Sequence, residues 1–302
     1  MSVFTAPIEL YRILKYIGGH PVTRSRRLGA FWRFLRFQVA VRLWPQGLLY
    51  GFVGGSRLIL SRNQGESGGY CYVGLPEYQE MGLVLHLLRG GDHFVDVGAN
   101  IGAYTVLASA VARARTTAVE PIPSTLQRLT DNICINAIEG RVRALNVGAA
   151  RKRGRLPFTT RLGSRNCCLY GSSRTVGEDL VELPVAPLDE ILRGDDATVL
   201  KVDTEGFEHE VVAGASDVLR SASLQCLIIE AWNDSDLRDA ILGCGFEEYD
   251  YDPADRQLTP RRTPAVGERP CMRNSAIFLR DASFAKARVS SAPLVDVFGV
   301  KL

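Results

Sequence analysis

Short β-rich runs alternate with longer helical patterns between residues 94 and 279, and this alternation constrains the fold more than any other feature. It is typical of a mostly parallel α/β sheet with helices on both faces. We expect helices to begin near Ile101, Ser124, Glu208 and Ser235, each after a turn or a polar capping residue. We expect seven strands, at Phe94–Val97, Thr117–Val119, Val142–Val147, Val199–Val202, Leu224–Ile229, Phe246–Asp250 and Ser275–Leu279.

The composition is that of a globular protein. Of the 302 residues, 46% are hydrophobic and 23% are charged, so the chain can bury a large core without disulfides or metals. Disordered, collagen-like and coiled-coil structures are therefore excluded. The seven cysteines form no C-x-x-C motif and no Cys/His pair at zinc spacing, so we expect reduced cysteines and no metal. A net charge of +3 does not indicate a nucleic-acid binder.

Three regions are predicted along the chain. Residues 1–74 form a basic helical and hairpin extension, residues 75–281 form the α/β domain with an insertion at 151–187, and residues 282–302 form a C-terminal tail. Pro21 divides the extension into two helices. The apolar runs Arg57–Leu60 and Tyr70–Val73 are interpreted as a small hairpin or strand pair.

Positive charge is concentrated in the extension, because residues 1–65 hold ten Arg or Lys and a single acid, Glu9. A basic amphipathic arm can cap a domain, pair subunits in a homo-oligomer, or lie on an anionic surface, and the sequence leaves these alternatives open. The basic residues of the insertion fit a substrate loop or a solvated surface equally well. These residues are Arg151, Lys152, Arg153, Arg155, Arg161, Arg165 and Arg174.

No segment of the sequence predicts a transmembrane helix. The longest uncharged stretch of the first third, residues 43–56, is interrupted by Pro45 and by glycines, and a spanning helix needs about 20 apolar residues. The first residues also lack the layout of a secretory signal. We therefore expect a cytoplasmic protein.

The first expected strand runs directly into a glycine-rich turn, with Asp96, Gly98 and Gly102 at the spacing D-x-G-x-x-x-G. Such a turn brings backbone N–H groups and a helix N-terminus close to a ligand, as in nucleotide sites. A dinucleotide fingerprint would have glycine at the first, third and sixth positions. Here Asn100 takes the middle position and the third glycine is missing, which favours S-adenosylmethionine over NAD.

Two acids flank this turn. Glu120 ends the second strand, where an acid accepts hydrogen bonds from ribose hydroxyls in folds of this type. Asp96, at the end of the first strand, is placed to meet the ammonium of a methionine moiety or to order the loop around it.

A third candidate site is the segment 200–210, whose strand ends at Asp203. Asp203 and Glu205 should face the same crevice as Asp96, because ligands bind at the carboxyl ends of parallel strands. If a helix begins by residue 205, Glu205 and His209 share one face and His209 joins the candidates for proton transfer. A divalent metal held by Asp203, Glu205 and Glu230 is the less favoured interpretation.

Several motifs together resemble the FkbM family of S-adenosylmethionine-dependent methyltransferases, over roughly residues 75–280. They are Asp96–Gly102 with Tyr104, the segment Val119–Pro121, Asn132, Asn136, and the segment Lys201–Gly206 with Glu208.

The resemblance implies a seven-stranded, Rossmann-like class I methyltransferase fold and methyl transfer to a hydroxyl of a sugar, glycolipid or polyketide-type molecule. It makes Asp203 and Glu205 candidates at the reacting end. The positions that it assigns to the cofactor S-adenosyl-L-methionine are Asp96, Gly98, Ala99, Asn100, Ile101, Gly102, Tyr104, Glu120, Pro121 and Asp203.

Rival functions lack their signatures. An NAD-dependent oxidoreductase acting on a sugar hydroxyl, the nearest alternative, predicts a third glycine and a Tyr-x-x-x-Lys or His unit, and neither is found. A metal-dependent hydrolase predicts a histidine cluster, whereas the four histidines are scattered. A non-catalytic binding module leaves the coincidence of three strand-end motifs unexplained.

Overall fold

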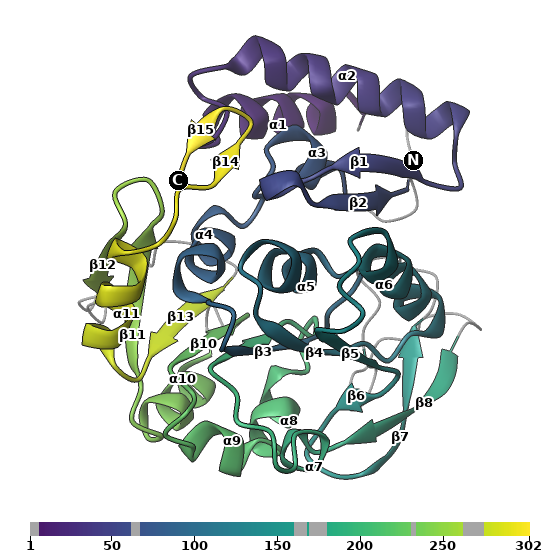
Figure 1. Cartoon of the computed structure of the whole chain (residues 1–302). Coiled ribbons are helices and arrows are strands. Elements are labelled where there is room, and N and C mark those ends of the chain that lie inside the picture. The colour runs from purple at the N-terminus through teal and green to yellow at the C-terminus, as the bar shows by residue number, and fades with distance from the viewer. Residues whose placement is uncertain (1–5, 62–66, 160–167, 169–179, 231–233, 262–274) are drawn as a thin grey trace.

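A computed structural model describes residues 6–61, 67–159, 168, 180–230, 234–261 and 275–302. Its centre is a twisted sheet with helices on both faces, and a separate layer of N-terminal helices and a hairpin covers one side (Figure 1). The α-helices are α1 Ala6–Gly19, α2 Arg27–Leu43, α3 Ser67–Tyr72, α4 Tyr78–Leu87, α5 Ala103–Val106, α6 Pro123–Ile135, α7 Leu188–Ile191, α8 Glu208–Ala213, α9 Ser216–Arg220, α10 Ser235–Leu242 and α11 Ala282–Ser290. A short 3-10 helix, η1 Val53–Gly55, and a π-helical segment, η2 Leu107–Val111, complete the helical elements of the described residues.

The main sheet has the strand order β12-β11-β13-β10-β9-β3-β4-β5. Strands β5, β4, β3, β9 and β10 are mutually parallel, and β13 lies antiparallel between β10 and β11. The bounds are β1 Leu48–Gly51, β2 Arg57–Leu60, β3 His93–Val97, β4 Arg115–Val119, β5 Val142–Leu145, β6 Gly148–Ala149, β7 Gly154–Thr159, β8 Leu180–Ala186, β9 Val199–Val202, β10 Cys226–Ile229, β11 Glu247–Asp252, β12 Gln257–Pro260, β13 Ala276–Leu279, β14 Asp296–Val297 and β15 Val300–Lys301.

All seven predicted strands are present in this mixed, mostly parallel sheet, and the predicted fold class is confirmed. The four predicted helix starts fall within two residues of α5, α6, α8 and α10. The sheet also gains the edge strand β12, which was not expected. The run 142–147 stops earlier than predicted, because the chain leaves the main sheet after β5 and enters a small sheet of β6, β8 and β7.

The core consists of two apolar clusters, one on each face of the sheet. Every residue of β3, β9 and β10 is buried, because both faces are covered by helices. The chain consequently has continuous apolar runs at these strands instead of alternating ones. A charged residue inside such a run needs a specific partner.

The sequence predicted that Arg57–Leu60 pairs with Tyr70–Val73, and the second of these partners is wrong. Strand β2 pairs with β1, and Tyr70–Tyr72 belong to helix α3. The reason is local: Gly54 and Gly55 adopt positive φ and turn the chain back directly after β1. Strand β1, which precedes this turn, therefore becomes the antiparallel partner of β2.

Two asparagines of the resemblance motif fasten this hairpin to the domain. Asn132 accepts a hydrogen bond from the amide of Ile59 (2.7 Å) and donates to the carbonyl of Ile101 (2.8 Å). Asn136 accepts from the amide of Arg57 and donates to its carbonyl, both at 2.8 Å. In addition to its pairing with β1, strand β2 therefore receives from these two side chains hydrogen bonds of the kind that a further strand would make. Asn132 also fixes the glycine turn through its bond to the carbonyl of Ile101.

The C-terminal tail packs against both layers. Helix α11 is joined to the start of β3 by the ion pair of Arg288 with Asp92 (3.0 Å). The guanidinium of Arg33, on α2, lies 3.9 Å from the centre of the Phe298 ring. Within the described ranges, no helix is both long and apolar enough to cross a membrane.

Candidate active site

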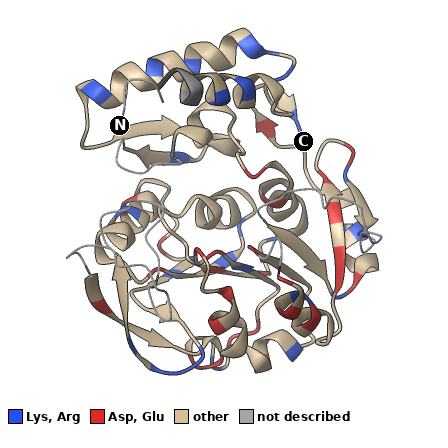
Figure 2. Ribbon diagram, turned by 180° about the vertical axis from the view of Figure 1, so that it is seen from behind, with Lys and Arg blue, Asp and Glu red and all other residues tan. Residues whose placement is uncertain are grey.

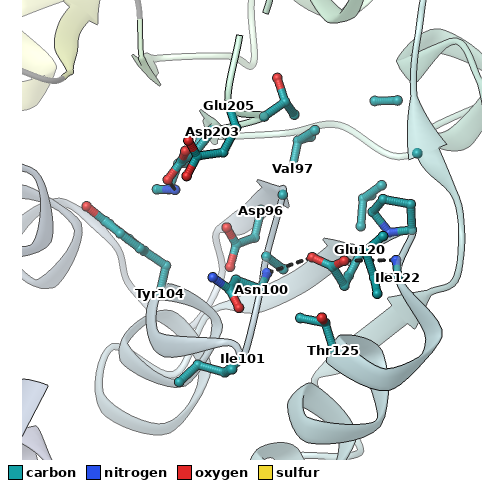
Figure 3. Close-up of a pocket in the computed structure, with 18 of the residues that line it drawn as sticks. Asp96, Val97, Asn100, Ile101, Tyr104, Glu120, Ile122, Thr125, Asp203 and Glu205 are labelled. Carbon is teal, nitrogen blue, oxygen red and sulfur yellow. Dashed lines mark hydrogen bonds and ion pairs between the residues drawn. The ribbon is translucent and has the colours of Figure 1, made fainter. Parts of the chain in front are cut away.

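A pocket opens at the carboxyl ends of β3, β4 and β9, the edge at which sheets of this type bind ligands. It measures about 970 Å³, including the part that is open to solvent. Figure 3 shows Asp203 and Glu205 on one side of it and Glu120 and Thr125 on the other, with Asn100 between them. The pocket therefore has two chemically different ends.

The glycine turn forms the floor between these ends. Gly98 has φ +76°, and a Cβ there would lie 1.8 Å from the carbonyl oxygen of Asp203, so only glycine lets the two strand ends approach. Gly102, predicted as a cofactor position, is not among the described residues that line the pocket. A Cβ on Gly102 would lie 2.3 Å from Leu129, so this glycine permits α5 to pack against α6.

Glu120 is 5% exposed and is held by the turn itself. Its two carboxylate oxygens accept hydrogen bonds from the amides of Asn100 (3.0 Å) and Ile122 (2.9 Å). Burial raises the pKa of Glu120 to about 7 despite these donors. Since each oxygen has two lone pairs, both can accept a further hydrogen bond from a ligand hydroxyl.

Asp96 is buried on β3 and lines the same pocket. Its Oδ2 accepts a hydrogen bond from the hydroxyl of Thr105 (2.7 Å), whereas Oδ1 has no hydrogen-bond partner among the described atoms. Burial raises the pKa of this carboxyl group. A buried acceptor without a partner is costly, so Asp96 is suited to a donor supplied by a ligand.

Lys201 was not predicted as a site residue, although it is 4% exposed and lines the pocket. The parallel register places it directly beside Asp96, and its amine lies 2.8 Å from Oδ2 of Asp203. Burial by itself would lower the pKa of Lys201, but the carboxylates of Asp203, Glu77 and Asp96 outweigh it and raise that pKa. The sequence signal was a lysine inside an otherwise apolar strand.

Glu77 and Tyr104 complete this group. The Tyr104 hydroxyl donates to Glu77 Oε2 (2.6 Å), and the Lys201 amine lies 4.6 Å from the centre of the tyrosine ring. Burial raises the pKa of Glu77 to about 7. Glu77 precedes α4, outside every motif, so no sequence signal singled it out. Tyr104, which the resemblance assigns to the cofactor, lines the pocket, and its ring contacts the amine of Lys201.

Three acids lie close together where β9 and its neighbour β10 end: Asp203, Glu205 and Glu230. Asp203 and Glu205 line the pocket, and Glu205 has φ +56°. Burial, followed by the negative charges of Asp203 and Glu205, raises the pKa of Glu230 to about 8. Burial and these charges thus favour the protonated form of Glu230, which shares a hydrogen bond with Asp203. In the described part of the chain, no cluster of His, Cys, Asp or Glu has the arrangement of a metal site.

The predicted shared face of Glu205 and His209 is wrong. Helix α8 begins at Glu208, and the positive φ values of Glu205 and Gly206 keep those residues out of it. His209 is exposed, pairs with Asp234, and is not among the described residues lining the pocket. Glu208 instead accepts hydrogen bonds from the amide and hydroxyl of Thr204, both at 2.9 Å, and so holds the loop that carries Glu205.

The insertion and the extension both reach the pocket. Phe158 and Cys168 line it from the insertion, and Tyr70 lines it from α3. Of the basic residues there, Arg153 pairs with Glu190 and Arg151 with Glu210, as on a solvated surface. Arg161, Arg165 and Arg174 lie outside the described residues.

The other predicted positions lie in the pocket wall. Ala99, Asn100, Ile101 and Pro121 all line it, and Asn100 adopts φ +50°. Cys71, Cys134, Cys226 and Cys244 carry free thiols, as expected, and Cys167 and Cys271 lie outside the described residues.

Comparisons with known proteins show that this chain is similar to methyltransferases. Residues 96–248, about half of the chain, match the family described as the methyltransferase FkbM domain. The hexuronic acid methyltransferase AglP of Haloferax volcanii is 30% identical over 155 residues, which cover 50% of this chain and 62% of that protein. The methyltransferase sdnD of Sordaria araneosa is 27% identical over 186 residues, covering 51% of this chain and 71% of that protein.

Among solved structures, the methyltransferase FkbM from Methylobacillus flagellatus KT is similar, with a TM-score of 0.44 and 20% identity. That match covers 71% of this chain and 53% of the other. This chain therefore aligns with less than two thirds of the length of the Haloferax protein and of the Methylobacillus protein.

Proposed function

This chain belongs to the FkbM methyltransferase family, and from that membership we propose that it transfers a methyl group from S-adenosylmethionine to a hydroxyl of a sugar or glycosylated small molecule. The observation that carries the proposal is the pocket itself, which sets Asp96 and Glu120 on opposite sides of one glycine turn. The alternative of an NAD-dependent oxidoreductase finds no support in the family match.

The residues present fit the cofactor. Glu120 can accept hydrogen bonds from both ribose hydroxyls, since each of its oxygens has a lone pair left after the backbone donors. The unpartnered Oδ1 of Asp96 can accept the ammonium of the methionine moiety. S-Adenosylmethionine supplies an electrophilic methyl group on a sulfonium, which is already a good leaving group.

The protein then has to align the acceptor oxygen and remove its proton. Alignment of reacting groups can contribute about 7–11 kcal/mol, and a general base a further 10²–10⁴-fold. Glu205 lines the pocket and is exposed there, so we assign proton removal to it, and we assign positioning to Asp203, which pairs with Lys201. His209 has no part in this assignment.

The acceptor class is supported by the relative that methylates hexuronic acid. A uronic acid offers two kinds of oxygen. A methylated hydroxyl is an ether and resists alkali, whereas a methylated carboxylate is an ester and is cleaved by it. A carboxylate also carries no proton at neutral pH, so only hydroxyl methylation needs Glu205.

The test is methyl transfer from labelled S-adenosylmethionine to a glucuronide, a glucoside and an unglycosylated alcohol. We expect alkali-stable label on a sugar and a roughly 100-fold lower kcat in Glu205→Gln with the cofactor Kd unchanged. The exposed residue Glu139 provides the control variant Glu139→Gln, for which we expect the wild-type rate. Alkali-labile label, or full activity of Glu205→Gln, would contradict the assignment.

Cofactor affinity should depend on pH through Glu120. Ionised Glu120 is the form that accepts two ribose hydroxyls, and its pKa in the free protein is raised to about 7 by burial. The fraction of the protein in which Glu120 is ionised therefore falls as the pH drops. We expect the Kd of S-adenosylhomocysteine to be roughly tenfold higher at pH 6 than at pH 8. Calorimetric titration at several pH values measures this, and Glu120→Gln should flatten the profile. A flat wild-type profile would show that Glu120 does not titrate against the ligand.

A further inference from the structure

The outer face of α2 carries a stripe of exposed apolar side chains, Leu28, Trp32, Leu35, Val39 and Leu43. Spacings of three and four residues place them on one side of the helix. Each is between 51% and 85% exposed. The opposite face of α2 is the buried one, so the apolar stripe is not needed for packing within the chain.

Ala30, Phe37 and Val41 form that inner face. Phe34 and Phe37 pack against the ring of Tyr72 on α3, and Arg33 donates to the carbonyl of Tyr72 (2.9 Å). A helix that already has a complete inner face would ordinarily expose polar residues on the other side. The stripe is thus an unpartnered surface of the kind that marks an interaction site.

Cations border the stripe. Arg36 lies along one edge of the apolar stripe and Arg42 along the other, as the helical rotation of about 100° per residue requires. Both arginines are exposed. Within the described ranges, no ion pair joins either arginine to a carboxylate, and Arg42 bonds only to Gln38. Figure 2 shows the basic segments spaced along this helix.

We propose that the apolar stripe of α2, with its bordering arginines, docks on an anionic lipid surface, the helix lying in the plane of the interface. A protein surface that combines exposed apolar side chains with arginines can bind such a membrane, because the apolar groups are buried among the headgroups while the arginines meet lipid phosphates. Trp32 and the exposed Trp44 suit the interface, because an indole is apolar and carries one N–H donor.

Charge decides against a second copy of the chain as the occupant. Two copies pairing through this stripe would bring Arg36 and Arg42 of one against those of the other. Residues 1–65 contain only one acid, Glu9, against ten basic residues, so little is available to neutralise them. Negatively charged lipid headgroups can neutralise these arginines, whereas the same face of a second copy cannot. This inference does not depend on the proposed function.

Flotation with vesicles tests the proposal. We expect the full chain to bind vesicles of phosphatidylcholine with roughly a third phosphatidylglycerol, to bind pure phosphatidylcholine far less, and to be released by salt. Arg36→Gln with Arg42→Gln should weaken binding about fivefold for each arginine. Trp32→Ala should weaken it roughly tenfold through lost apolar burial.

Matched controls are available elsewhere on the surface. Arg141→Gln with Arg193→Gln, both exposed, and Leu294→Ala, 69% exposed, should bind like the wild type. All variants should keep wild-type affinity for S-adenosylhomocysteine, which separates this test from that of the proposed function. The proposal would be overturned by equal binding to neutral vesicles or by no binding at all. It would also be overturned if the Arg36→Gln/Arg42→Gln variant and Trp32→Ala both bound like the wild type, or if the chain formed a dimer that Trp32→Ala dissociates.

Discussion

Lys201→Met is expected to lower the free energy of unfolding by about 3–5 kcal/mol at pH 8, because removing one partner of a buried ion pair leaves its charge uncompensated. The amine of Lys201 lies 2.8 Å from Asp203, and the carboxyl groups of Glu77 and Asp96 also act on it. Methionine keeps the length of the side chain and removes only the charge. Urea denaturation measures the loss.

The loss should be smaller at pH 5. Burial raises the pKa of Glu77 to about 7, so at pH 5 this carboxyl group is largely protonated and repels little; burial raises the pKa of Asp96 as well. Lys152→Met, at an exposed lysine, should change stability by less than about 0.5 kcal/mol at either pH. A loss for Lys201→Met that is the same at both pH values would mean that the charge of Glu77 contributes nothing to it.

Glu120→Ala is expected to raise the Kd of S-adenosylhomocysteine by about 100-fold or more, since two charge-assisted hydrogen bonds to ribose contribute about 1.5–3 kcal/mol each. The variant also leaves the amides of Asn100 and Ile122 without their acceptor, so the glycine turn loses support.

Glu120→Gln separates these two effects, because it retains a carbonyl acceptor while losing the charge. We expect a loss in between. Glu139→Ala, at an exposed glutamate on the surface, provides the matched control and should bind normally. Calorimetric affinity within threefold of wild type for Glu120→Ala would remove Glu120 from the cofactor site.

The parts of the site that were predictable follow from local patterns. Asp96, Gly98 and Glu120 were identified because a strand, a glycine turn and the next strand are consecutive in the sequence, and parallel strands bring their carboxyl ends together. The strand-end acids Asp203 and Glu205 were found by the same rule. These residues line one pocket in the structure.

What was missed depends on long-range register or on single dihedral angles. Lys201 meets Asp96 only because β3 and β9, far apart in the sequence, pair in one particular register. The shared face of Glu205 and His209 was wrong because the positive φ of Glu205 keeps that residue out of α8, which begins at Glu208. The apolar run at Tyr70 is too short for its period to distinguish a strand from a helix, and it proved to be helical.

The central claim, that the pocket between Asp96 and Glu120 binds S-adenosylmethionine, is tested most directly by calorimetric titration of the wild-type protein with S-adenosylhomocysteine, with NAD as a parallel titrant. We predict one site of roughly micromolar Kd for S-adenosylhomocysteine and no heat from NAD at the same concentrations. Binding of NAD, or of neither compound, would contradict the claim and leave only the α/β fold and the family membership in place.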